Sequence, residues 1–213
     1  MINMLFDGAE HTAGELGRGA RVSPATASEH LATLTEAGIV TGRSHGRHRY
    51  FQLADADIAH ALEQLSKGYP EAKVTSLRLS REQQRVRAAR TCYDHLAGQL
   101  GVAVAQRFVD LSWIDPEFSL LTEPGFRGLE NHFGIDPAAP SGSRRPLLRS
   151  CMDWTEQRPH LAGAVGAAVA ASCLTRHFVV RKPGSRALTV TERGRQYFAE
   201  FGIGPGHDTS RGL

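Results

Sequence analysis

Two signals for the start of a helix stand close together near the beginning of the chain, and they restrict what this segment can fold into. Thr12 and Glu15 have the spacing of a capping box, in which a hydroxyl and a carboxylate satisfy the first free N–H groups of a helix. Ser23 followed by Pro24 is the second signal, because serine is a favoured N-cap and the missing N–H of proline costs nothing at the first helical position. Gly38 is placed to end this second helix. The sequence therefore predicts two short helices joined by a tight turn.

A β-hairpin with a basic turn is predicted directly after the second helix. Residues 39–40 and 50–53 are short β-rich runs, and the polar stretch between them contains Gly42 and Gly46. Residues 55–65 return to helical spacing, with apolar side chains on one face. The order helix, turn, helix, hairpin and helix is typical of a winged helix-turn-helix domain, whose second helix enters the major groove of DNA.

The predicted second helix and hairpin carry side chains that suit a DNA-binding surface. The first turns of the helix hold small or hydrogen-bonding residues, which fit against base edges and phosphates. The hairpin holds cations that can pair with phosphates or enter the minor groove. The candidate DNA-binding residues are Ser23, Ala25, Thr26, Ser28, Glu29 and His30 on the helix, and Arg43, His45, Arg47, His48 and Arg49 on the hairpin.

The chain divides at residues 68–70, where Gly, Tyr and Pro break the helical pattern. We expect a winged helix-turn-helix domain over residues 1–69, and a helical C-terminal domain over residues 70–213 that serves dimerisation, effector sensing or both. The expected fold class is mainly α with small β-hairpins (α+β). The elements predicted in the C-terminal domain are a long helix at 81–109, a loop-rich stretch at 115–146, helices at 147–154 and 159–174, a hairpin at 178–190 and a closing helix at 191–201.

Two internal echoes mark the C-terminal domain. The run His-Leu-Ala-Gly-Gln-Leu-Gly at residues 95–101 recurs as His-Leu-Ala-Gly-Ala-Val-Gly at residues 160–166. The glycines three apart in each copy favour close helix packing. In addition, the order helix, strand, basic turn, strand and helix at residues 24–65 appears again at residues 160–201. This second echo indicates a degenerate winged helix near the end of the chain.

Four side chains of the C-terminal domain form a candidate effector or metal site: Cys92, His95, Cys151 and His160. On the predicted long helix, Cys92 and His95 are three residues apart and therefore share one face. Cys151 and His160 gather with Asp153 near a predicted helix junction. Two thiolates and two imidazoles suit a thiophilic metal ion.

Other interpretations of these residues stay open. A buried cysteine usually packs as a small hydrophobic residue, and the two histidines can form hydrogen bonds at a helix contact, which leaves the domain purely structural. A small organic effector can instead occupy an apolar pocket that involves Tyr93, Trp113 and Trp154. The effector is therefore a metal ion, a thiol-reactive species or a small molecule.

Charge leaves two classes of partner open for the first domain. The whole chain has a formal net charge of +3 and a pI near 9.0, which is compatible with nucleic acid. Residues 1–69, however, carry six Lys and Arg against eight Asp and Glu, a net charge of −2. This value favours the alternative that the winged helix is a protein-interaction module without sequence-specific DNA binding.

Composition and motifs indicate a cytoplasmic protein that is not an enzyme. Three cysteines are too few for a disulfide framework, and acidic residues interrupt any apolar run at the N-terminus that could form a secretory signal. The apolar stretch at 161–174 is shorter than the roughly 20 residues needed to span a membrane. The chain has no phosphate-loop lysine motif and no dinucleotide glycine fingerprint. A catalytic thiol would need a histidine that is oriented by a carboxylate. Asp94 is expected to point away from His95, so the sequence offers no such arrangement for Cys92.

Residues 5–66 resemble the ArsR-type repressors. The resemblance is carried by the Thr-Ala-Gly-Glu-Leu run at 12–16, by Val-Ser-Pro-Ala-Thr-Ala-Ser-Glu-His-Leu at 22–31, by Glu-Ala-Gly-Ile-Val at 36–40 and by Gly-Arg-His-Arg-Tyr-Phe-Gln-Leu at 46–53. It implies a homodimer on a palindromic double-stranded DNA operator, with repression relieved by an effector.

Two features depart from that family. Its members usually carry a longer first helix that contributes to the dimer interface, whereas only residues 1–6 stand in its place. Either the start of the chain lies elsewhere or the C-terminal part takes over dimerisation. The metal ligands of the best-known members do not carry over, because no cysteine lies near Thr12, and Asp55, Asp57 and His60 follow the hairpin with another spacing.

Overall fold

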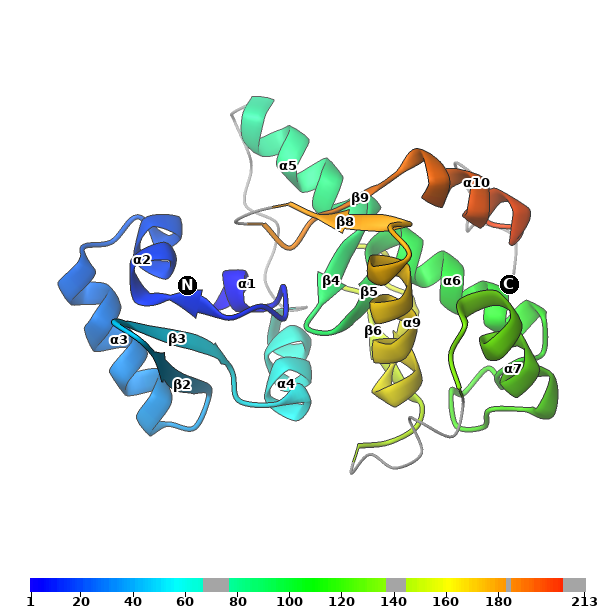
Figure 1. The fold of residues 1–213 in the computed structure, drawn as a ribbon, viewed down its shortest axis with the longest axis horizontal. Coiled ribbons are helices and arrows are strands. Elements are labelled where there is room, and N and C mark those ends of the chain that lie inside the picture. The colour runs from blue at the N-terminus through cyan, green and yellow to red at the C-terminus, as the bar shows by residue number, and fades with distance from the viewer. Residues whose placement is uncertain (67–76, 137–144, 183–184, 205–213) are drawn as a thin grey trace.

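A computed structural model describes residues 1–66, 77–136, 145–182 and 185–204 (Figure 1). It combines helices with small antiparallel sheets, which confirms the α+β fold class. The N-terminal elements lie at one side of the molecule and the elements after residue 77 at the other. The boundary predicted at residues 68–70 lies outside the described residues.

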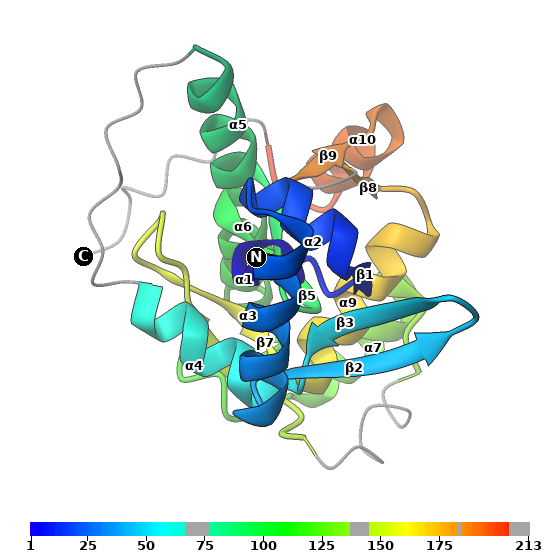
Figure 2. The ribbon, with the colours of Figure 1, turned by 90° about the vertical axis from the view of Figure 1, so that its left-hand side faces the viewer.

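The N-terminal elements after residue 12 follow the predicted order, and a short helix and a short strand that were not predicted precede them. Together the elements are α1 (Ile2–Leu5), β1 (His11–Thr12), α2 (Ala13–Ala20), α3 (Pro24–Glu36), β2 (Val40–His45), β3 (His48–Leu53) and α4 (Ala56–Ser66). The three strands form one antiparallel sheet in the order β1-β3-β2. Figure 2 looks at this side and shows α3 beside the β2–β3 hairpin.

Both predicted helix starts are confirmed. The Thr12 hydroxyl accepts a hydrogen bond from the Glu15 N–H, and the Glu15 carboxylate accepts one from the Thr12 N–H, which completes the capping box of α2. The Ser23 hydroxyl accepts from the Thr26 N–H at the start of α3. Gly38 follows α3 with a φ of +71°, a left-handed conformation that glycine adopts without steric cost. A hydrophobic core joins these elements, and its buried members are Leu5, Phe6, Leu16, Leu31, Val40, Phe51, Leu53 and Ala59.

The C-terminal part alternates short hairpins with helices. Its first elements are α5 (Leu77–Ala88), β4 (Arg90–Cys92), β5 (His95–Ala97), α6 (Gly98–Asp110), α7 (Glu123–Gly128) and the π-helix η1 (Leu129–Phe133). They are followed by β6 (Arg149–Met152), β7 (Pro159–Ala162), α9 (Gly163–Thr175), β8 (Val179–Arg181), β9 (Leu188–Val190) and α10 (Glu192–Glu200). The hairpin predicted at 178–190 and the closing helix are confirmed.

Three predictions for this part are wrong. The single helix expected at 81–109 is two helices separated by the β4–β5 hairpin, and the helix expected at 147–154 is largely the strand β6. The helix expected to begin at residue 159 begins after β7, at Gly163. The stretch at 115–146 contains α7 and η1. Gly98 and Gly163 have φ values of +73° and +81°, so each marks the sharp change from strand to helix.

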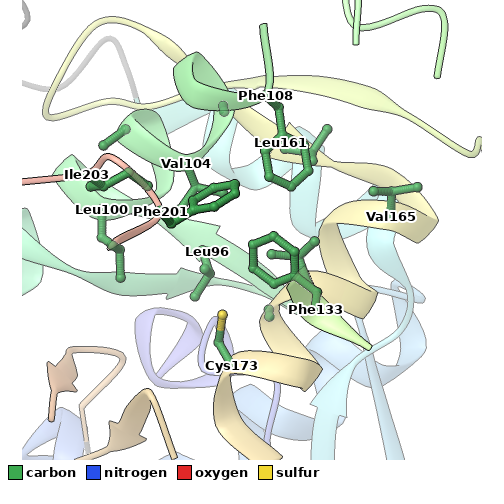
Figure 3. Packing of buried hydrophobic residues seen from close by; sticks show 14 of the residues in the cluster. Leu96, Leu100, Val104, Phe108, Phe133, Leu161, Val165, Cys173, Phe201 and Ile203 are labelled. Atoms are coloured by element: carbon green, nitrogen blue, oxygen red, sulfur yellow. The ribbon is translucent and has the colours of Figure 1, made fainter. Parts of the chain in front are cut away.

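The second hydrophobic core lies between α6, α9 and α10. Figure 3 shows Phe108, Phe133 and Phe201 close together in it, and the ring centroids of Phe108 and Phe133 are 5.6 Å apart. Trp113 packs beside Phe108, with ring centroids 4.9 Å apart. The order α9, β8, β9, α10 repeats the order α3, β2, β3, α4, as the second echo predicts. Among the described residues, no helix has both the length and the apolar character needed to cross a bilayer.

Candidate nucleic-acid interface and buried thiol–imidazole cluster

The predicted DNA-contacting side of α3 faces away from the core. Its candidate residues Ser23, Ala25, Ser28, Glu29 and His30 are exposed, and Thr26 is half-buried. The opposite side of the helix packs inward through Ala27 and Leu31, which are fully buried. The Oγ atom of Ser23 lies 2.9 Å from Oγ1 of Thr26, so both hydroxyls take part in the helix cap. The first turns of α3 are therefore open to a ligand along one face.

All five basic residues predicted on the hairpin are exposed: Arg43, His45, Arg47, His48 and Arg49. The register of β2 and β3 pairs Arg43 with Tyr50 and His45 with His48, so these four side chains share one face of the hairpin. Arg49 lies on the other face, with its guanidinium carbon 5.2 Å from the centroid of the Phe51 ring.

An ion pair is also present on the hairpin. Arg43 donates to Glu10 at 2.8 Å, but the Arg43 side chain is 75% exposed. The pair therefore leaves its guanidinium accessible to a phosphate.

The four candidate effector residues come together in the centre of the C-terminal part. Cys92, Cys151 and His160 are fully buried, His95 is 6% exposed, and one ligand atom from each lies within 4.8 Å of the others. The two Sγ atoms are 4.0 Å apart, and the two Nε2 atoms are 3.1 Å apart.

The secondary structure around this cluster differs from the prediction. Cys92 and His95 do not share a helix face but lie directly opposite each other across the β4–β5 pair. Cys151 and His160 are opposite each other in the same way across the β6–β7 pair. Each hairpin therefore contributes one sulfur and one imidazole.

The first echo corresponds to two structural repeats, β4–β5–α6 and β6–β7–α9. Helix α6 packs against β7 of the other repeat, and α9 packs against β5. A Cβ atom at Gly101 would lie 2.4 Å from the Leu96 carbonyl oxygen and 3.6 Å from Cβ of His160. A Cβ atom at Gly166 would lie 2.4 Å from the Leu161 oxygen and 3.4 Å from Cβ of His95. The glycines allow close packing, as predicted, but between a helix and strands rather than between two helices.

A carboxylate lies beside each imidazole of the cluster. Nδ1 of His95 is 3.3 Å from Oδ1 of Asp94, which corrects the expectation that this carboxylate points elsewhere. Nδ1 of His160 is 3.4 Å from Oδ2 of Asp153. A carboxylate at Nδ1 favours a proton on that nitrogen. The two Nε2 atoms are at hydrogen-bond distance, so without an ion one of them carries a proton, which a cation bound to both nitrogens would displace.

Hydrogen bonds, burial and neighbouring charges together set the protonation of the cluster. A hydrogen bond with Cys151, together with burial, raises the pKa of the Cys92 thiol to about 12. Burial alone would raise the pKa of Asp153, but His160 and Arg90 hold it well below its usual range. A bound cation would instead favour the thiolate, because a coordinating thiol loses its proton.

A buried ionic network connects the cluster to α4. Nη2 of Arg90 is 2.9 Å from Oδ2 of Asp153 and 3.8 Å from Oε1 of Glu63, and all three side chains are inaccessible to solvent. Glu63 also lies 3.2 Å from Arg186. The Arg90 guanidinium stacks on Trp154, 5.0 Å from its ring centroid.

The backbone beside Cys92 contacts the N-terminal elements directly. The Tyr93 N–H and the Thr91 hydroxyl both donate to the carbonyl oxygen of Phe6, at 2.9 Å and 3.2 Å. Gly8 is so close to this hairpin that a Cβ atom there would lie 2.5 Å from the Tyr93 oxygen. The segment between α1 and β1 is thus held against the strand that carries Cys92.

The aromatic residues considered for an organic effector take separate places. Trp113 packs in the second hydrophobic core, Trp154 covers Arg90, and Tyr93 lines a surface pocket of about 630 Å³. The pocket lies between α4 and the two repeats, and its lining includes Asp94, His95, Arg145 and Arg149. It reaches the edge of the thiol–imidazole cluster through His95.

Sequence reasoning placed Asp153 near Cys151 and His160, but it missed the contact of Asp94 with His95 and the role of Arg90. A signal for them exists, since Arg-Thr-Cys-Tyr-Asp at residues 90–94 recurs as Arg-Ser-Cys-Met-Asp at residues 149–153. The histidines follow at different intervals because the turn of the second hairpin is longer. The sequence comparison that begins at each histidine therefore did not include residues 90–94 and 149–153, which precede the histidines.

The exposed face of α3, the short turn before it and the basic hairpin beside it define a winged helix-turn-helix protein of the DNA-binding class. Residues 5–43 match the family described as helix-turn-helix domain. The chain is also 42% identical to the HTH-type transcriptional regulator YdfF of Bacillus subtilis (strain 168) over 197 aligned residues. The aligned stretch covers 91% of this chain and 86% of the relative. The chain therefore belongs to the family of HTH-type transcriptional regulators, which are DNA-binding proteins.

Proposed function

We propose that this regulator is a dimeric repressor of the ArsR type, which releases a palindromic operator in response to an effector. In this proposal residues 1–69 bind DNA, and residues 70–213 hold the dimer together, sense the effector or do both. The observation that carries the DNA-binding part is the exposed face of Ala25, Ser28 and His30 next to the basic hairpin. The resemblance of residues 5–66 to ArsR-type repressors supports the dimer and the mode of regulation.

The two parts of the surface have different roles. Side chains in the first turns of α3 read base edges in the major groove, while Arg43, Arg47 and Arg49 pair with phosphates or enter the minor groove. The local concentration of cations on the hairpin offsets the acidic balance of residues 1–69. Binding then depends on this cluster rather than on the net charge of the domain.

The test is selection of a duplex from a random-sequence pool, followed by affinity measurements at several salt concentrations. We expect a recovered sequence with two-fold symmetry and a protein dimer by analytical ultracentrifugation. The double substitution Arg47→Ala and Arg49→Ala should weaken binding to most sequences and reduce the slope of log affinity against log salt by about 2. A matched control removes two exposed arginines of α7 and α10, Arg127 and Arg195, and should leave binding unchanged.

The alternative function, a winged helix that docks proteins, makes the opposite prediction. It requires that the pool yields no enriched sequence and that loss of Arg47 and Arg49 has no effect on binding to duplex DNA. Either result would remove the repressor proposal.

The effector has two candidate locations. The pocket lined by Tyr93 and Arg145 has a volume within the roughly 300–1,000 Å³ typical of small-molecule sites. The buried cluster of Cys92, Cys151 and the two histidines suits a metal ion or a thiol-reactive species instead.

A further inference from the structure

The geometry points to a closed tetrahedral site in which Cys92, His95, Cys151 and His160 bind one thiophilic divalent cation, zinc above all. Because the two repeats supply two ligands each, the ion would tie the β4–β5 and β6–β7 hairpins together. Binding of an ion at this site would in turn fix the position of the N-terminal elements relative to the two repeats. That regulatory part rests on the proposed function, whereas binding of the ion does not.

The distances between the ligand atoms fit one ion at the centre. Two sulfurs at about 2.3 Å from a tetrahedral zinc lie about 3.8 Å apart, and two nitrogens at about 2.0–2.1 Å lie about 3.3 Å apart. The observed separations are 4.0 Å for the Sγ pair and 3.1 Å for the Nε2 pair. The sulfur pair and the nitrogen pair are therefore each within a few tenths of an ångström of the tetrahedral separation, and all four ligand atoms lie within 4.8 Å of one another.

The charges also balance at this buried position. Two thiolates and two neutral imidazoles around a divalent cation give a neutral centre, which avoids the large cost of burying net charge. A set of two sulfurs and two nitrogens favours zinc over magnesium or calcium, which prefer oxygen ligands. Four protein ligands leave no open position for a substrate, so the site is structural or regulatory rather than catalytic.

The surroundings supply the outer contacts that such a site needs. Asp94 and Asp153 lie at Nδ1 of the two histidines and direct both Nε2 atoms toward the centre. Asp153 is itself held by Arg90 and by the N–H of Gly98, which is 2.6 Å from its Oδ2 atom. His95 lines the surface pocket, which gives an ion a route from solvent.

Two connections link the site to the DNA-binding half. Thr91 and Tyr93, the neighbours of Cys92, both donate to the Phe6 carbonyl in the segment that leads toward α2. Arg90 joins Asp153 of one repeat to Glu63 of α4. Fixing the hairpins with an ion would therefore fix the positions of the segments on either side of the helix-turn-helix.

The first experiment titrates Co²⁺ into the full-length, chelator-treated protein under nitrogen. We expect one ion per chain, with the intense visible bands of tetrahedral cobalt and a thiolate-to-cobalt charge-transfer band, and displacement by an equivalent of Zn²⁺. Cys92→Ser and Cys151→Ser should each lose about half of the charge-transfer intensity. The control Cys173→Ala removes the remaining cysteine, which is buried in the second hydrophobic core, and should bind cobalt like the wild type.

A second measurement does not depend on any variant folding. X-ray absorption of the zinc-loaded wild type should show two sulfurs at about 2.3 Å and two nitrogens at about 2.0–2.1 Å. A shell of nitrogen and oxygen alone would overturn the assignment. So would a Cys92–Cys151 disulfide in protein that was purified under nitrogen and binds no zinc.

The regulatory part is tested with the duplex recovered from the random pool. Zinc-loaded and chelator-treated protein should differ in affinity for it by about 5- to 150-fold, the usual range of allosteric coupling, and Cys92→Ser should abolish the difference. Equal affinities with zinc bound would refute the coupling but not the metal site. A protein that binds zinc but no DNA would instead refute the proposed function.

Discussion

Arg90 of β4 and Glu63 of α4 are both fully buried, and Nη2 of the arginine lies 3.8 Å from Oε1 of the glutamate. Glu63 lies on α4, whose Ala59 and Leu62 belong to the N-terminal hydrophobic core, and Arg90 begins β4 of the first repeat, so their contact joins the DNA-binding elements to the repeats. A charge in such a position needs its partner, because water cannot replace it.

Replacing Arg90 by methionine should strongly destabilise the protein. The change leaves Asp153 without its 2.9 Å partner and takes the guanidinium of Arg90 away from Glu63, and we expect the free energy of unfolding to fall by about 3–5 kcal/mol. Urea unfolding followed by circular dichroism measures this loss. Arg87→Met is the matched control, because Arg87 is 58% exposed and its ion pair with Glu156 should contribute about 0–1 kcal/mol. Similar losses for both substitutions would contradict the importance of the buried network.

Adding a methyl group at Gly166 should also destabilise the protein. The new Cβ of Gly166→Ala would lie 2.4 Å from the Leu161 carbonyl oxygen, and backbone cannot move aside as a flexible side chain can. We expect a loss of about 1–3 kcal/mol in urea unfolding. Gly14→Ala, in the first turn of α2, meets only the end of the Arg18 side chain and should instead stabilise by about 0.5 kcal/mol. An unaffected Gly166 variant would show that the repeats are not closely packed.

Asp94 should act on the metal site through His95. In Asp94→Asn the carboxylate that orients the imidazole is lost, so zinc affinity should fall by about 10- to 100-fold while the cobalt spectrum keeps its form. Competition with a chromophoric chelator measures the affinity. Asp57→Asn removes an exposed carboxylate that pairs with Arg149 and should not change it. An Asp94 variant with wild-type affinity would exclude this positioning role.

The capping box of α2 predicts a pH effect at the start of the helix-turn-helix. The Thr12 N–H and hydroxyl bind the Glu15 carboxylate and hold its pKa below the ordinary 4.5. Since the folded pKa is the lower one, the carboxylate stabilises the fold above pH 4.5, and this contribution is lost as the pH falls through the folded pKa. An NMR titration should give a Glu15 pKa below 4.5, and Thr12→Ala should move it toward that value. A pKa of 4.5 or above in the wild type would contradict the cap.

The N-terminal half was predictable because its signals are local. Thr12, Ser23 and Gly38 each determine a helix end through contacts within four residues, and the exposed cations follow from the hairpin pattern. The order of the elements from α2 to α4 could therefore be read directly from the chain, whereas α1 and β1 were not predicted.

The repeats were not predictable in the same way. The β4–β5 turn contains Tyr93 with a φ of +60°, not the glycine or asparagine that usually marks such a turn, and the neighbouring apolar residues fit a helical period as well. The strand β4 is completed by distant backbone, since Thr91 donates to the carbonyl of Arg186. The four candidate ligands could be named from their chemistry, but their arrangement required the pairing of the two hairpins.

The division of the four ligands between two similar units has a consequence for the origin of the site. One unit alone offers a sulfur and a nitrogen, half of a closed coordination sphere, so a chain with a single unit could complete the sphere only by meeting a second molecule. Fusion of two units would make the same centre independent of protein concentration. Assembly in one chain then replaces association as the step that builds the site.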